Sequence, residues 1–140
     1  MTAGHERIAA AFAAVAGDGR RAALMPYLMG GFPDLATSRA IGVACVNAGA
    51  DLLEVGVPYA DPLADGPVIH DAGSRALAAG ARTGDVLDVA GELGELVPVL
   101  CMCYANLIYA RGVERFVADL AARGVAGLIV PDLPLEEGDA

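Results

Sequence analysis

The chain has 140 residues, is 56% hydrophobic and has a formal net charge of −9, and all of its basic residues are arginines. This length is enough for one domain with its own core. Because so acidic a chain repels phosphate backbones, nucleic-acid binding is not expected. The longest apolar stretches, residues 22–32 and 97–105, are shorter than the roughly 18 residues that a membrane span needs. Residues 1–6 do not resemble the start of a signal peptide, so we expect a cytoplasmic protein.

Helical and strand patterns alternate along the chain. Ile8, Phe12 and Val15 recur at helical spacing, which predicts an amphipathic first helix. Gly49 follows the second predicted helix at a C-cap position, and Thr83 is predicted to cap a later one. The predicted elements, in order, are a helix at 6–16, a strand at 23–29, a helix at 36–47, a strand at 50–55, a loop at 58–66, helices at 68–79 and 85–93, a strand at 97–103, a helix at 113–122 and a strand centred on 128–130.

This alternation, with strands that are almost entirely apolar, predicts a parallel sheet whose outer face is covered by helices. Residues 49–55 align with residues 124–130 at an offset of 75, which favours a barrel of equivalent units. A doubly wound dinucleotide fold would show a G-x-G-x-x-G motif after the first strand, and residues 30–33 do not. The predicted fold class is therefore α/β, of the (β/α)8 TIM-barrel family.

A complete barrel of this class needs eight units and typically about 250 residues. This chain supplies an N-terminal helix and about the first four β/α units. We therefore expect residues 1–140 to form the N-terminal half of a single TIM-barrel domain, with no separate second domain.

Acidic residues gather at the end of the second predicted strand. Glu54 lies among apolar neighbours at that strand end, the usual place for catalytic groups in a parallel barrel. Burial there would raise its pKa, which suits a group that gives and takes a proton near neutral pH. The alternative is a glutamate that pairs with an arginine or reaches solvent. Asp61 and Asp65 follow in a proline-stiffened loop typical of a lid or a partner-binding surface.

The cysteines and histidines suggest no further chemistry. Cys101 and Cys103 are two residues apart, so they point to the same face of the predicted strand. Together with Cys45, they are predicted to be inert thiols in a reducing compartment. No metal site is expected. His5 and His70 are predicted to be surface residues rather than catalytic ones.

The segment from Leu53 to Pro67, LEVGVPYADPLADGP, closely resembles the signature of the tryptophan synthase alpha chain family. Nearly the whole chain carries further matches, at residues 25–34, 47–51, 74–77, 102–106 and 127–134. One small departure is Met29-Gly30-Gly31, where the family often has Thr-Ala-Gly.

The resemblance implies a lyase of tryptophan biosynthesis that cleaves indole-3-glycerol phosphate by a retro-aldol reaction, giving indole and glyceraldehyde 3-phosphate. It implies that Glu54 is the general acid and base, and that Asp65 stabilises positive charge on the indole nitrogen. Tyr27, Met102 and Tyr104 match residues that line the indole pocket. No cofactor is implied for this chain.

The resemblance also implies a partner, the tryptophan synthase beta chain, which carries pyridoxal phosphate in an alpha2-beta2 type complex. Pro58 and Asp61 match the loop that contacts it, and Asn106 lies on the same side. Members of the family bind the substrate phosphate with their last strands, which lie outside residues 1–140, so this chain by itself is expected to be inactive.

Two other interpretations stay open at this stage. The chain is alternatively a non-catalytic half-barrel that acts only in assembly or in beta-chain contact. A different phosphate-binding barrel, such as a ribulose-phosphate epimerase or an isomerase of aromatic biosynthesis, would be expected to show metal-ligating His and Asp at strand ends. No His ends a strand here.

Overall fold

The computed structural model describes residues 3–137 and contains one sheet of four parallel strands in the order β1-β2-β3-β4. The elements are α1 (Gly4–Gly17), β1 (Tyr27–Met29), α2 (Leu35–Asn47), β2 (Leu53–Gly56), α3 (Pro67–Ala78), α4 (Thr83–Gly94), β3 (Val99–Met102), α5 (Ala105–Arg111), α6 (Val113–Ala122), β4 (Gly127–Ile129) and a short 3₁₀ helix, η1 (Leu135–Glu137).

The strand order confirms the predicted barrel topology. Each strand pairs with the next one along the chain, and Tyr27, Glu54, Leu100 and Gly127 occupy neighbouring register positions. A doubly wound sheet reverses its strand order at a switch point, whereas this sheet advances in one direction. The four strands therefore form a stretch of barrel wall.

The strands are shorter than the sequence pattern predicts. The first was predicted from residue 23 but begins at Tyr27, and the third was predicted from residue 97 but begins at Val99. Each begins directly after a proline, Pro26 or Pro98, and proline has no backbone N–H to donate to a sheet. Apolar composition marked the strands correctly, while proline set where they begin.

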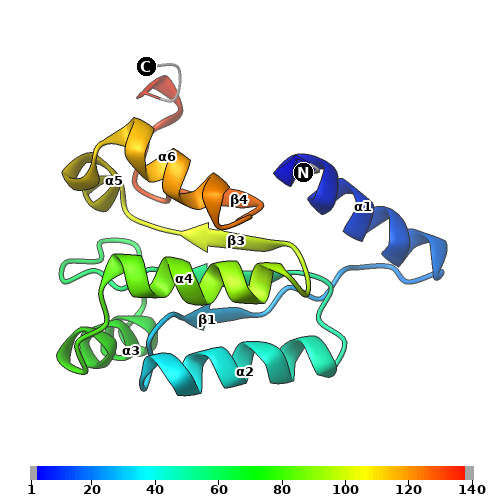
Figure 1. Ribbon diagram of the computed structural model, residues 1–140, viewed down its shortest axis with the longest axis horizontal. Helices are drawn as coiled ribbons and strands as arrows, with labels where there is room; N and C mark the ends of the chain where they lie inside the picture. Colours follow the sequence, from blue (N-terminus) through cyan, green and yellow to red (C-terminus); the bar gives the residue numbers. More distant parts are fainter. Residues whose placement is uncertain (1–2, 138–140) are drawn as a thin grey trace.

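Helices cover one face of the sheet, as predicted (Figure 1). Leu28, Val55 and Cys101 occupy paired positions, point toward the helices and are buried in the core. Cys103 is buried as well, which confirms that these thiols lie in the helix-covered layer. Burial raises the pKa of both Cys101 and Cys103 to about 12, so they are held as thiols.

The helix ends differ in detail from the sequence prediction. Gly49 and Gly124 both take left-handed φ values, 101° and 71°, just after a helix, which supports the internal repeat. The prediction that Thr83 caps α4 was wrong, because Thr83 lies inside the first turn. Instead, the carboxylate of Asp85 accepts a 3.2 Å hydrogen bond from the N–H of Arg82.

One helix was not predicted from the sequence. Helix α5 has only seven residues, too few to show a helical period, and its apolar Leu107 and Ile108 are adjacent in the chain. Gly112, at φ 90°, separates α5 from α6, the helix that was predicted at residues 113–122 and that buries Phe116 and Leu120.

Helix α1 lies at the amino-terminal ends of the strands, on the right in Figure 1. The Arg7 guanidinium fastens it there by donating to the carbonyl oxygen of Gly124 at 2.8 Å and to that of Gly94. The apolar face of α1 that was predicted from Ile8, Phe12 and Val15 is only partly buried, since the Val15 side chain is 3% exposed but that of Phe12 is 52% exposed. An open sheet gives α1 one wall to pack against, whereas a closed barrel would offer a complete floor.

Among the helices of residues 3–137, none combines the length and apolar character required to cross a bilayer.

Candidate active site at the carboxyl ends of the strands

Glu54 lies on the uncovered face of the sheet, opposite the helix layer. Its register neighbours are Tyr27 on β1 and Leu100 on β3, so it stands in the middle of a row of side chains. The side chain is half-buried, and burial raises the pKa of its carboxyl above the ordinary value of 4.5. In the described part of the chain no arginine lies within ion-pair distance of Glu54. Burial thus raises the pKa of Glu54 in the direction that was expected from the sequence.

The loop between β2 and α3 brings Asp65 to the same end of the sheet. The hydroxyl of Tyr104, just beyond β3, accepts a 2.9 Å hydrogen bond from the N–H of Ala64. Burial and then the nearby Asp65 carboxylate raise the pKa of Tyr104. The ring of Tyr59, with its centroid 5.4 Å from that of Tyr104, adds an aromatic contact from the same loop. Asp65 is half-buried, while Leu63 at the loop tip is 82% exposed.

Tyr27 lies in the same row as Glu54 and reaches across β2. Its hydroxyl crosses to β2 and lies against Gly56, where an added Cβ would meet the Tyr27 oxygen at 2.0 Å. Glycine is therefore required at position 56 for Tyr27 to lie across the strand. The hydroxyl is buried and has no hydrogen-bond partner among the described residues. Burial first, and then the charges of Asp65 and Glu54, raise the pKa of Tyr27.

Met102 completes this end of the uncovered face. It pairs in register with Gly56, and its carbonyl accepts a 2.8 Å hydrogen bond from the N–H of Val57. Leu100 and Met102 are half-buried, whereas the alternating residues Cys101 and Cys103 are fully buried on the helix side. The expected alternation along β3 is confirmed. The structure thus brings Tyr27, Glu54, Asp65, Met102 and Tyr104 to one end of one face.

The three residues that were predicted to contact a partner lie at this end of the sheet. Asp61 and Asn106 are exposed, one on the loop and the other in the first turn of α5. Pro58 is buried at the base of the loop. Two of the three are therefore accessible in the chain as it stands.

Sequence reasoning missed Asp132, which follows β4. Its carboxylate accepts a 2.9 Å hydrogen bond from the N–H of Ala105, at the start of α5. The contact ties the end of β4 to the end of β3 beside Tyr104. The signal was available, because Asp132 follows an apolar strand within three residues, at the end of the sheet where the loop after β2 carries Asp65.

No metal site was expected, and within residues 3–137 no three His, Cys, Asp or Glu side chains are grouped so as to hold a metal ion. His5 and His70 are both exposed, which confirms the prediction that they are surface residues.

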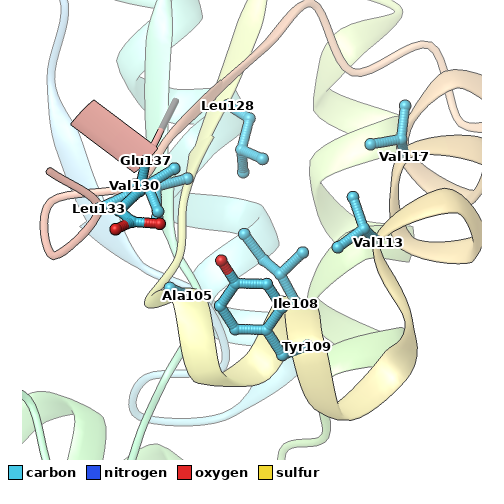
Figure 2. Close-up of a pocket in the computed structure, with 9 residues that line it drawn as sticks. All are labelled: Ala105, Ile108, Tyr109, Val113, Val117, Leu128, Val130, Leu133 and Glu137. Atoms are coloured by element: carbon cyan, nitrogen blue, oxygen red, sulfur yellow. The ribbon is translucent and has the colours of Figure 1, made fainter. Parts of the chain in front are cut away.

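A hollow lies on the helix-covered face of the sheet, opposite the face that carries Glu54, and is drawn in Figure 2. We call it the β4 groove; its volume is about 430 Å³. It lies between α5, α6 and the helix-covered face of β4, and its lining is apolar except for the Glu137 carboxyl and the Tyr109 hydroxyl. The lining residues are Ala105, Ile108, Tyr109, Val113, Val117, Leu128, Val130, Leu133 and Glu137.

Comparison with known proteins shows the family to which the chain belongs. The sequence model of the family described as "Tryptophan synthase alpha chain" matches residues 12–140. The chain belongs to the tryptophan synthase alpha chain family. The family resemblance read from residues 53–67 is thereby confirmed.

Curated relatives agree over almost the whole chain. A tryptophan synthase alpha chain of Prochlorococcus marinus is 49% identical over 139 residues, which cover 96% of this chain and 50% of the relative. That of Gloeobacter violaceus is 52% identical over 136 residues, covering 96% of this chain and 49% of the relative. The chain thus spans about half the length of these relatives.

Solved structures confirm the TIM-barrel family fold. Tryptophan synthase from M. tuberculosis superposes with a TM-score of 0.90 at 41% identity, covering 94% of this chain and 53% of the other. The alpha subunit from Legionella pneumophila superposes with a TM-score of 0.89 at 34% identity, covering 95% and 52%. That residues 1–140 form half of one domain, with no second domain, stays a prediction.

Proposed function

We propose that this chain carries the acid/base half of an active site that cleaves indole-3-glycerol phosphate into indole and glyceraldehyde 3-phosphate. The observation that carries the proposal is the position of Glu54: a half-buried carboxyl on the uncovered face of β2, two residues before that strand ends at Gly56, with a raised pKa and the Asp65 loop following the strand. Membership of the tryptophan synthase alpha chain family supports the assignment of this reaction to tryptophan biosynthesis.

Glu54 would act as both general acid and general base. Its protonated carboxyl would deliver a proton to carbon C3 of the indole ring, which makes the ring a leaving group. The bond from C3 to the glycerol phosphate side chain would then break, with its electron pair returning to the indole ring, as the adjacent hydroxyl passes its proton to the Glu54 carboxylate and its carbon becomes the aldehyde. A raised pKa favours this role, because the acid must still hold its proton near neutral pH.

Asp65 would act as the ionised partner. Protonation of C3 places positive charge on the ring nitrogen, and a carboxylate beside that nitrogen would stabilise it. The two carboxyl groups lie in different surroundings, since Glu54 stands on an apolar strand and Asp65 on a loop that reaches solvent. Separate surroundings allow one group to stay protonated while the other is charged.

Tyr27, Met102 and Tyr104 would line the indole pocket. All three are at the Glu54 end of the uncovered face, and their aromatic rings and thioether suit a flat apolar ligand. No cofactor is needed for this step. We infer that a beta chain with pyridoxal phosphate docks on the Asp61 and Asn106 side, as the sequence predicted.

The isolated chain is expected to have negligible activity. The substrate phosphate is predicted to bind to strands that are outside residues 1–140, and the four-stranded wall leaves its uncovered face open to water. The alternative function, a half-barrel that serves only assembly or beta-chain contact, is favoured by one observation, the apolar β4 groove at an open sheet edge.

An indole-release assay tests these statements. The chain is assayed alone and after co-expression with the part of the M. tuberculosis relative that it does not cover, which would supply further strands. We expect no measurable release from the chain alone and release from the complemented protein. In the complemented protein, Glu54→Gln should lower the rate at least about 100-fold, the usual contribution of a general acid/base.

Each arm has an outcome that contradicts the proposal. Turnover by the chain alone that disappears in Glu54→Gln would overturn the expected inactivity. Turnover by the complemented protein that persists in Glu54→Gln would remove Glu54 from the chemistry. If the complemented protein folds but releases no indole, the assembly interpretation is favoured instead.

A further inference from the structure

Asp132 joins two neighbouring β/α units through a contact that the proposed chemistry does not use. It follows β4 within three residues, and its carboxylate accepts a 2.9 Å hydrogen bond from the N–H of Ala105. The two residues are 27 positions apart, so the bond is tertiary rather than part of a local turn. Ala105 is the first residue of α5, where a backbone N–H has no partner within its own helix. Asp132 therefore satisfies a donor that the helix leaves free.

The residue at the N-cap of α5 does not take this role itself. That residue is Tyr104, whose side chain makes no capping bond. Its hydroxyl instead accepts the N–H of Ala64 at 2.9 Å, and its ring packs against that of Tyr59 with the centroids 5.4 Å apart. A serine or aspartate at an N-cap would use its own oxygen on the helix. Because Tyr104 is directed to the loop after β2, the start of α5 depends on an acceptor from outside.

Tyr104 lies between two bonds to the β4 unit. On one side, the N–H of Cys103 donates to the carbonyl oxygen of Ile129 at 2.9 Å. On the other side, the N–H of Ala105 donates to Asp132. Fixing the backbone before and after Tyr104 restricts the directions that its side chain can take. The first bond continues the backbone pairing of the sheet, whereas the second depends on a single carboxylate.

We propose that Asp132 is a positioning residue: by holding the N–H of Ala105 it directs Tyr104 toward the loop after β2, where the Tyr104 hydroxyl holds Ala64 and with it Asp65. A side chain from the end of the fourth strand then fixes the loop that follows the second. Asp132 is exposed, so its replacement opens no cavity in the core. The consequence for turnover rests on the proposed function, whereas the series of contacts does not.

Amide hydrogen exchange on the 140-residue chain, followed by NMR, tests the contacts without any substrate. Asp132→Ala should speed exchange at Ala105, its direct partner, and also at Ala64, whose bond depends on the placement of Tyr104. We expect about a fivefold acceleration at Ala64, as the loss of one hydrogen bond would give. Asp132→Asn keeps a side-chain oxygen that can accept the bond, so exchange at Ala64 should stay close to the wild-type rate.

The variant Tyr104→Phe shows whether the effect passes through the Tyr104 hydroxyl. Ala64 has already lost its acceptor in this variant, so adding Asp132→Ala should not speed its exchange further. The amide of Ala126, which donates to Val99 at the other end of β3, should keep its rate in Asp132→Ala. An unchanged Ala126 shows that β4 stays paired.

Asp34→Ala is the matched control. Asp34 also stands before a helix, and its carboxylate accepts the N–H of Thr37 at 2.8 Å in the first turn of α2. Asp34→Ala removes the same kind of bond and the same charge from an exposed position. It should leave the exchange of Ala64 unchanged, since α2 does not carry Tyr104.

The complemented protein adds a functional measurement. Asp132→Ala should lower kcat/KM for indole release about tenfold, because a small displacement of a positioned group can cost up to about 100-fold. Asp132→Asn should recover most of the loss. Recovery by a neutral acceptor is expected of a residue that acts through a hydrogen bond, and it is not expected of one that acts through its charge.

The outcomes divide clearly. Wild-type exchange of Ala64 in Asp132→Ala would overturn the proposal, as would equal acceleration in Asp34→Ala or additive effects with Tyr104→Phe. Faster exchange at Ala126 would mean that β4 has loosened as a whole, and Asp132→Asn as fast as Asp132→Ala would exclude the hydrogen bond. Either result also counts against it. Coupling between Asp132 and Tyr104 combined with turnover that persists in Glu54→Gln would uphold the contacts and reject the proposed function.

Discussion

The hydroxyl of Tyr104 accepts a 2.9 Å hydrogen bond from the backbone N–H of Ala64, forty residues earlier in the chain. This bond joins the end of β3 to the loop that follows β2. It fixes Asp65, the next residue, at the end of the sheet where Glu54 stands. The two carboxyl groups are therefore held at one site by a contact that involves neither of them directly.

Removal of that hydroxyl should loosen the loop. We expect Tyr104→Phe to destabilise the chain by about 1 kcal/mol, because the partly buried N–H of Ala64 loses its acceptor. Urea unfolding measures the change. Tyr109→Phe is the matched control, since Tyr109 is 62% exposed and should change stability little. Equal effects of the two substitutions would contradict a specific role for the Tyr104 bond.

Glu54 should make stability depend on pH. Its pKa in the folded chain lies above the ordinary value of 4.5, so the folded state binds the proton more tightly than the unfolded state. Its favourable contribution is complete below pH 4.5 and is lost as the pH rises through the folded pKa. Glu54→Gln has no such dependence, so it should gain stability relative to wild type over that range.

The gain should stay below about 1 kcal/mol, because the carboxyl keeps some contact with water. Unfolding by urea from about pH 4 to about pH 8 measures it. Glu95→Gln, at an exposed position, is the control. A relative stability of Glu54→Gln that is flat, or that falls as the pH rises, would contradict a raised pKa.

Arg7 should hold α1 to the sheet. Its guanidinium donates to the carbonyl oxygens of Gly94 and Gly124, which precede β3 and β4. We expect Arg7→Ala to destabilise the chain by about 1–3 kcal/mol, since charge-assisted bonds to two partly buried carbonyls are lost. Faster amide exchange throughout α1 should accompany it. Arg21→Ala, at an exposed arginine, should do neither.

An alanine at position 56 should displace Tyr27. The added Cβ would lie 2.0 Å from the hydroxyl oxygen and 2.7 Å from the ring carbon that bears it. We expect Gly56→Ala to destabilise the chain by about 1–3 kcal/mol, as overpacking does. Gly84→Ala is the control, because nothing lies within 4 Å of its Cβ and alanine favours the helix. Unchanged NMR signals of Tyr27 in Gly56→Ala would contradict the packing described here.

The β4 edge should drive self-association. Tyr109, Val113 and Val117 are each about half exposed or more, and they border the β4 groove (Figure 2). We expect sedimentation to show association that rises with concentration, since the outer edge of β4 is also unpaired. Val117→Glu should weaken it with little loss of stability. A monomer at all concentrations would contradict the expectation.

Sequence alone was sufficient for the class of fold and for Glu54 as a candidate. Apolar strands between amphipathic helices predict a parallel sheet, because only burial on both faces explains strands without polar alternation. The 53–67 segment was specific enough to indicate the family, which the match over residues 12–140 confirmed. A carboxyl group at an apolar strand end also predicts a raised pKa without coordinates.

Short and irregular features were not predictable in this way. The seven-residue α5 is too short to establish a period, and the start of α4 depends on a bond from Asp85 rather than on Thr83. The strands begin at Tyr27 and Val99, directly after Pro26 and Pro98, so for the strand starts a signal was present in the sequence and was overlooked.

Only the tertiary structure decided how the site is assembled. The 2.9 Å bond from Ala64 to Tyr104, the position of Tyr27 against Gly56 and the unpartnered hydroxyl join residues from three different strand ends. Such contacts depend on strand register and on the path of a loop through space, which are global properties of the packed chain. Periodicity along the sequence reports local burial, so it identified the carboxyl groups but not what holds them together.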